Sequence, residues 1–201
     1  MAELDDFLAR WAHPMLASRG YRKSRHTFRK RFSGGWSVLS FRAHPIGILG
    51  SFHADASFVP APLFDWFRFR SPDLAGKEPT GWWMEWSTPL RAAQGNDWTY
   101  ESLGQAEDRG ILLGERLAAV IERFDEFGVD EDALLRLVLQ PEHFESAAIP
   151  LFQHRLRWPP YRAAVLIPRG PSPELATILD WSDEYPLLRL REWADHYLAT
   201  H

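Results

Sequence analysis

The stretch that decides the fold spans residues 26–59 and has the sequence HTFRKRFSGGWSVLSFRAHPIGILGSFHADASFV. Side chains alternate in character over His26–Phe32, the Ser33–Gly35 step marks a turn, and aromatic and aliphatic residues return over Trp36–Ala43. A period of two residues on both sides of a glycine-containing turn is typical of a β-hairpin. The alternation over Phe52–Val59 predicts a third antiparallel strand.

The second strand of this hairpin leaves two interpretations open. Trp36 and Val38 lie in one phase of the alternation, whereas Leu39 and Phe41 lie in the other. Either a bulge shifts the register within the strand, or both faces of the strand are buried.

Helical periods flank the strands. Apolar residues recur every three or four positions over Leu4–Ser18, so a helix is expected there, with a break near His13 caused by Pro14 and a stop at Gly20.

Further helices are expected after residue 110. A wide apolar stripe over Ile111–Phe127 predicts the longest helix, and Gly128 stands where a C-terminal cap belongs. Arg162–Pro168 fits either a buried strand or the end of a helix. Asp130 is expected to cap a helix over 131–139. The other expected helices span 141–153, 172–181 and 186–197.

The order of these elements predicts an α+β fold. We expect an antiparallel sheet of four to five strands, with Trp82–Trp86 as a fourth strand and Asn96–Glu101 as a fifth. Helices are expected to cover one face, and the C-terminal half is expected to be helical. Residues 1–140 form the predicted α+β core domain, and residues 141–201 form a mainly helical C-terminal extension packed on the same domain.

Composition excludes several function classes. The 201 residues contain no cysteine, which excludes disulfides, thiolate zinc sites and cysteine nucleophiles and fits a reducing compartment. No apolar run approaches the roughly 20 residues of a membrane helix. The acidic start, MAELDD, differs from a basic targeting signal, so we expect a cytoplasmic protein. The sequence indicates no cofactor and no metal.

A family resemblance rests on three segments. These are the proline-containing first helix, the step Gly20-Tyr21-Arg22-Lys23, and the basic strand His26-Thr27-Phe28-Arg29. Over residues 3–140, with further support from the later strands, the Trp-rich block 81–86 and helix 111–127, the chain resembles the bacterial domain-of-unknown-function family 4304. The resemblance implies a small α+β cytoplasmic bacterial protein and carries over no catalytic residue.

A basic cluster invites a nucleic-acid interpretation. Residues 22–31 contain six cations, which phosphates could contact while nearby aromatic rings stack on bases. The net charge of −4 and the sequence pI of about 6.1 argue against this function. The six cations are Arg22, Lys23, Arg25, Arg29, Lys30 and Arg31.

Two groups of residues are candidates for a ligand or partner site. His53 and Asp55 stand two apart on one strand and so share a face, and Glu85 is available from a neighbouring strand. A hydrogen-bonded structural pair is favoured over a metal site here. The chain is rich in tryptophan, with ten in all, and Trp82, Trp83 and Trp86 must point to both faces of their strand.

These observations favour a non-catalytic binding or interaction protein. It would recognise a protein or a small ligand through an aromatic-rich sheet surface, and an immunity or antitoxin-like role is one version. One alternative is an enzyme with a site between the sheet and the C-terminal extension that uses His53, Asp55 and Glu85. The second alternative is nucleic-acid binding through residues 22–31.

Overall fold

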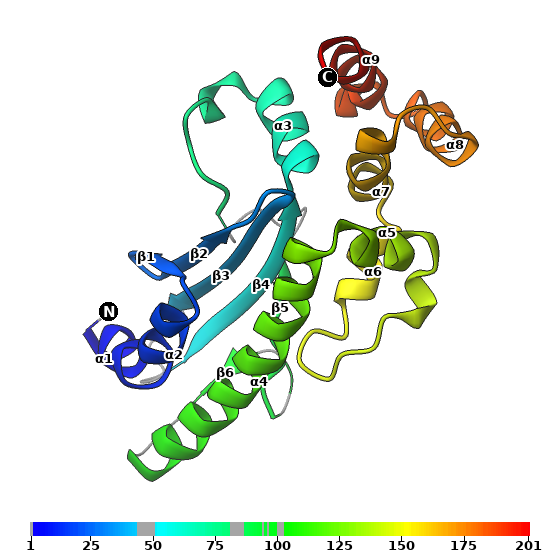
Figure 1. Ribbon diagram of the computed structural model, residues 1–201. Coiled ribbons are helices and arrows are strands. Elements are labelled where there is room, and N and C mark those ends of the chain that lie inside the picture. Colours follow the sequence, from blue (N-terminus) through cyan, green and yellow to red (C-terminus); the bar gives the residue numbers. More distant parts are fainter. Residues whose placement is uncertain (1, 44–50, 81–86, 94, 96, 100–102) are drawn as a thin grey trace.

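The computed structural model describes residues 2–43, 51–80, 87–93, 95, 97–99 and 103–201 (Figure 1). Its helices and strands follow one another in the order α1 (Ala2–Trp11), α2 (His13–Ser18), β1 (Arg22–Ser24), β2 (Thr27–Arg31), β3 (Gly35–Ala43), β4 (Phe52–Pro60), α3 (Ala61–Arg70), β5 (Thr88–Pro89), β6 (Asp97–Trp98), α4 (Leu103–Val129), α5 (Glu131–Leu139), α6 (Phe152–Arg157), α7 (Pro159–Leu166), α8 (Pro173–Ser182) and α9 (Leu190–Thr200). Short 3-10 helices are η1 (Pro72–Leu74), η2 (Pro141–His143), η3 (Ile167–Arg169) and η4 (Pro186–Leu188).

The strands form one antiparallel sheet with the order β1-β2-β3-β4-β5, and β6 also pairs with β4. This confirms the predicted α+β class and the predicted hairpin. β6 lies within the fifth strand predicted at 96–101, but it is only two residues long. The sequence pattern does not predict β5. The fourth strand predicted at 82–86 lies outside the described residues.

The pairing of β3 with β4 decides between the two interpretations of the hairpin's second strand. It runs without interruption from Gly35 opposite Pro60 to Ala43 opposite Phe52. Both phases of β3 are buried, with Val38 and Leu39 almost fully inaccessible to solvent. The second interpretation, burial on both faces, is therefore confirmed.

Helices cover one face of the sheet, as predicted. This face carries the phenylalanine side chains of β2, β3 and β4, and α1, α2 and α4 lie along it (Figure 1). Phe7 of α1 packs on Phe52 with a ring distance of 5.3 Å, and Phe124 of α4 packs on Phe58 at 5.9 Å. The hydrophobic effect of burying these rings holds the helices on the sheet.

The first helix breaks where the sequence predicts. α1 ends at Trp11 and α2 begins at His13, one residue before Pro14. Gly20 has a φ of +82°, a conformation that glycine adopts without strain, and it ends α2.

The expected cap at Gly128 is wrong. α4 continues through this residue to Val129, so Gly128 lies inside the last helical turn. A Cβ atom there would come within 2.2 Å of the Phe32 ring. Glycine serves close packing at this position rather than helix termination.

The C-terminal half is helical, with two differences from the prediction. Asp130 caps α5 by accepting a hydrogen bond from the Asp132 amide, as expected. The helix predicted over 141–153 is replaced by η2, an irregular stretch and α6, because Pro150 disfavours helical geometry just before it. Arg162–Pro168 lies in α7 and η3, and Pro186 opens η4 rather than α9.

The C-terminal segment shares the core of the sheet. Phe152 of α6 packs between Phe124, Phe127 and Tyr161, with ring distances of 5.7 to 6.2 Å. The Tyr161 hydroxyl donates a hydrogen bond of 2.9 Å to the carbonyl of Phe58 on β4.

Among the described residues, no helix has the length and apolar character of a membrane span.

Substitution of Gly110 and Gly114, which lie one helical turn apart on α4, tests the packing of α1 on this helix. A Cβ at Gly110 would lie 2.1 Å from the Trp11 ring, whereas a Cβ at Gly114 meets nothing within 4 Å. Gly110→Ala should therefore lower the free energy of unfolding by about 1–3 kcal/mol. Gly114→Ala should raise it by about 0.5–1 kcal/mol, because alanine favours the helix. Urea denaturation measures both, and equal effects would contradict the packing described.

Removal of one hydroxyl tests the link between α7 and the sheet. Tyr161→Phe leaves the buried Phe58 carbonyl without its hydrogen-bond donor, so the free energy of unfolding should fall by about 1–3 kcal/mol. The control is Tyr185→Phe, because the Tyr185 side chain is exposed. A Tyr161→Phe protein as stable as the control would show that this hydrogen bond contributes nothing to stability.

Candidate functional site

The second face of the sheet carries a row of polar side chains. Thr27, Ser40 and Asp55 lie opposite one another on β2, β3 and β4, and residues in register share a face. The Ser40 hydroxyl donates to Thr27 Oγ1 at 3.1 Å. All three residues are buried, so the row is a closed polar layer rather than an open surface.

Asp55 is the charged member of this row. Its side chain is 7% exposed, and Arg42 Nη2 donates to its Oδ2 at 3.3 Å. Burial raises the pKa of Asp55, and this effect outweighs the opposing influence of the Arg42, His53 and Arg155 charges.

His53 and Asp55 share the face on which the sequence predicts them. His53 lies opposite Arg42 in the next row, and it is half-buried. Arg155 comes from α6, in the C-terminal segment, and its Nε donates to the carbonyl of Ser87 at 3.0 Å. The structure thus brings a C-terminal cation near the His53–Asp55 pair.

The remaining members of the predicted aromatic site lie outside the described residues. These are Trp82, Trp83, Glu85 and Trp86. Their part in a site with His53 and Asp55 stays a prediction.

The basic cluster of residues 22–31 is largely neutralised within the fold. Four of its six cations are in ion pairs, with N–O distances of 3.1 Å for Arg22–Glu78, 3.8 Å for Lys23–Asp5, 3.9 Å for Arg29–Glu78 and 2.7 Å for Lys30–Asp125. Arg29 also donates to the Pro79 carbonyl at 2.7 Å, and burial lowers the pKa of Arg29. Among the described residues, only Arg25 and Arg31 of this cluster have no ion pair, which gives little support to nucleic-acid binding.

Two adjoining hollows lie at the end of the sheet where the β2–β3 turn meets α3. The first, which we call the apolar hollow, has a volume of about 200 Å³. The second, the arginine hollow, has a volume of about 410 Å³. Ala61, Pro62 and Tyr197 line both.

The apolar hollow lies on the helix side of the sheet. Phe58, Phe127, Leu134 and Val165 contribute to its walls, from β4, α4, α5 and α7 respectively. An apolar cavity of about 150 Å³ is large enough for benzene. This hollow therefore has room for one aromatic ring or a short alkyl chain.

The arginine hollow lies on the second face. Trp36 stands on β3 opposite Arg31, and their side chains contribute one wall. Phe64 and Arg68 are four residues apart on α3, so they share one side of the helix. The amide of Ala61 donates to the Gly34 carbonyl at 2.8 Å, which ties α3 to the hairpin turn and fixes these two walls relative to each other.

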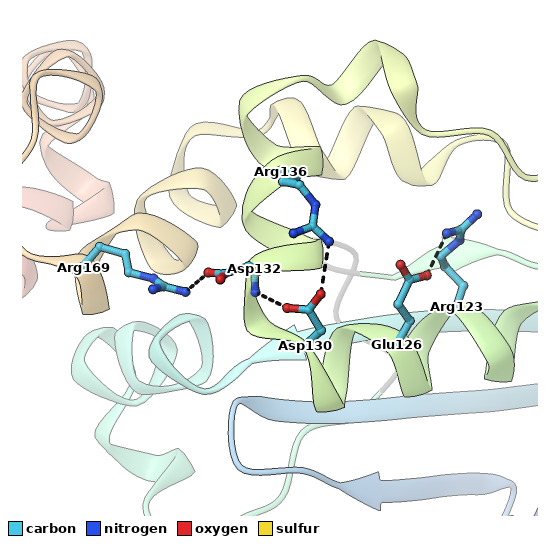
Figure 2. A network of polar contacts seen from close by, with 6 residues as sticks. All are labelled: Arg123, Glu126, Asp130, Asp132, Arg136 and Arg169. Carbon is cyan, nitrogen blue, oxygen red and sulfur yellow. Dashed lines mark hydrogen bonds and ion pairs between the residues drawn. The ribbon is translucent and has the colours of Figure 1, made fainter.

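Polar contacts hold the α5 wall of the apolar hollow in place. Figure 2 shows Arg169, at the end of η3, ion-paired with Asp132 in the first turn of α5. Asp130 accepts from the Asp132 amide at 2.9 Å and from Arg136 at 3.1 Å (Figure 2). The hydrogen bond from Arg136 lowers the pKa of Asp130. These contacts connect the end of α4, α5 and η3, next to Leu134.

Neither hollow was evident from the sequence pattern. Helical periodicity is obscured over Ala61–Arg70, where aromatic side chains occur on every side. One sequence feature points to the arginine hollow: Phe64 and Arg68 are four residues apart, a spacing that brings an aromatic ring and a cation together on a helix.

Comparisons with known proteins found no match. No family model, no curated protein and no solved structure is similar to this chain at a significant level. The resemblance to family 4304 therefore stays a prediction.

In the described part of the chain, no group of three or more metal-ligating side chains converges.

The raised pKa of Asp55 predicts a pH-dependent effect of Asp55→Asn. The folded protein binds this proton more tightly than the unfolded chain, so wild-type stability is lost as the pH rises from the ordinary value of 3.8 through the raised value. Asparagine does not titrate. The stability of Asp55→Asn relative to wild type should therefore increase over this pH window and then level off.

Urea denaturation at a series of pH values, from about pH 3 to 8, measures this difference. Asp195→Asn is the control, because Asp195 is exposed on α9. A decrease in the relative stability of Asp55→Asn as the pH rises would mean that Arg42 stabilises ionised Asp55 by more than burial destabilises it, and that the pKa of Asp55 is lowered.

Proposed function

We propose that this chain is a non-catalytic binding protein whose small organic ligand occupies the two adjoining hollows. The observation that carries the proposal is that Ala61, Pro62 and Tyr197 line both hollows, which places a compartment with mostly apolar side chains beside one that contains Arg31 and Arg68. Binding sites for small molecules commonly combine an apolar lining with a few placed polar groups.

The polar groups of the hollows support binding rather than catalysis. Asp65 accepts a hydrogen bond from the Trp193 indole at 3.1 Å, and Arg169 is ion-paired with Asp132. Both groups are thus committed to structural contacts. The enzyme alternative has less support, because the Asp55 carboxylate is 7% exposed and already faces Arg42.

The proposal includes a bacterial origin and a cytoplasmic location for this protein. The absence of cysteine from the sequence fits a reducing compartment.

A neutral probe tests whether the apolar hollow accepts a ligand. We expect 4-phenylbutan-1-ol to bind the wild-type protein in isothermal titration calorimetry. Val165→Phe places a ring in this hollow and should weaken binding at least about tenfold. The matched control is Val129→Phe, since Val129 is 84% exposed and lies outside both hollows.

Two results would contradict the proposal. One is the absence of binding of this probe, and the other is equal binding by Val165→Phe and Val129→Phe. Either result would favour a protein partner, as in the immunity or antitoxin-like version of the function.

A further inference from the structure

Two arginines in the arginine hollow have no carboxylate partner among the described residues. Arg31 is exposed at the end of β2, and Arg68 is exposed on α3. Arg68 Nη2 donates to the carbonyl of Lys77 at 2.8 Å, which fixes its position without neutralising its charge. The hollow thus holds two positive charges that form no ion pair among the described residues, against the one negative charge of Asp65.

Aromatic rings hold both guanidinium groups in place. Arg31 lies over the Trp36 ring at 5.4 Å from the ring centre, and Arg68 lies over the Phe64 ring at 4.3 Å. A cation on an aromatic face loses part of its freedom before any ligand arrives. Less conformational entropy is then lost on binding.

Among the described residues, the one acidic side chain that lines this hollow is committed elsewhere. Asp65 accepts from Trp193 Nε1 at 3.1 Å. On the opposite wall, Tyr197 stacks on His201 with ring centres 4.2 Å apart. The hollow therefore combines aromatic walls with two arginines against one aspartate, a small excess of positive charge.

We propose that the arginine hollow binds the carboxylate of an amphipathic ligand whose apolar part occupies the apolar hollow. The inference rests on the proposed function and names its ligand class. A guanidinium group presents its N–H donors in a planar fork that matches the two oxygens of a carboxylate. Ala61, Pro62 and Tyr197 line both compartments, so the two lie side by side, and a ligand that occupies both would pass over this shared wall.

The overall charge of the protein makes this site distinctive. The chain carries a net charge of −4, and four of the six cations of residues 22–31 are ion-paired within the fold. Arg31 has no such ion pair among the described residues. Because the net charge is negative, the overall charge of the protein does not attract a small anion, so an anion bound here would depend on the arginines of this hollow.

The test compares two probes that share a ring and a chain. Isothermal titration calorimetry with 4-phenylbutyrate and with 4-phenylbutan-1-ol separates the contribution of the carboxylate from that of the ring. On wild-type protein, the acid should bind about ten- to a hundredfold more tightly than the alcohol. Arg31→Gln and Arg68→Gln should each weaken binding of the acid by about tenfold and leave binding of the alcohol unchanged.

Two further variants sharpen the test. Arg31→Lys keeps the charge but loses the planar fork, so its affinity for the acid should fall between those of wild type and Arg31→Gln. Arg25→Gln is the matched control, because Arg25 is also exposed and has no ion pair among the described residues but lies in the β1–β2 turn. Thermal unfolding confirms that each variant is folded.

The outcomes separate the two proposals. If the acid and the alcohol bind equally well, or if the Arg31 and Arg68 variants behave like Arg25→Gln, the carboxylate site is wrong and the proposed binding function stands. If neither probe binds the wild-type protein, both proposals are wrong. A preference for the acid that depends on both arginines supports the carboxylate site.

Discussion

The uninterrupted pairing of β3 with β4 is the constraint on which the rest of the structure depends. Because side chains alternate along both strands, this register sends Phe58 to one face and Trp36 to the other at the same end of the sheet. Each side chain then contributes to a different hollow. A shift of one residue would exchange the aromatic face for the polar row and would remove both the core and the site.

Burial of both faces requires two different covers. The aromatic face is covered by apolar helices, which need only hydrophobic packing. The second face carries Thr27, Ser40 and Asp55, and these groups are buried with polar partners such as Arg42. A charge buried in this way needs its partner, since removing one member leaves the other uncompensated. The polar row is therefore a structural layer, and the open binding space lies beyond its end.

The local parts of the fold were predictable from the sequence, and the parts fixed by distant contacts were not. Pro14 and Gly20 act on their own neighbourhood, so the first helix ends where expected. The role of Gly128 depends on Phe32, which is 96 positions earlier in the sequence but packs against it, so local pattern alone gave the wrong prediction. The hollows also depend on distant contacts, since no sequence spacing relates the elements that form their walls, which are β2, β3, β4, α3, α4, α5, α7 and α9.

The contacts of the arginines divide them into two groups: those in ion pairs within the fold, and those without an ion pair that could bind a ligand. Arg22, Arg29 and Arg169 each meet a carboxylate, and such pairs fix the chain while leaving little charge to attract an anion. Arg31 and Arg68 rest instead on aromatic rings. A ring positions a guanidinium group through its face but leaves the edge N–H groups available. Cations held in this way keep both their charge and their donors, and that combination is what recognition of a carboxylate requires.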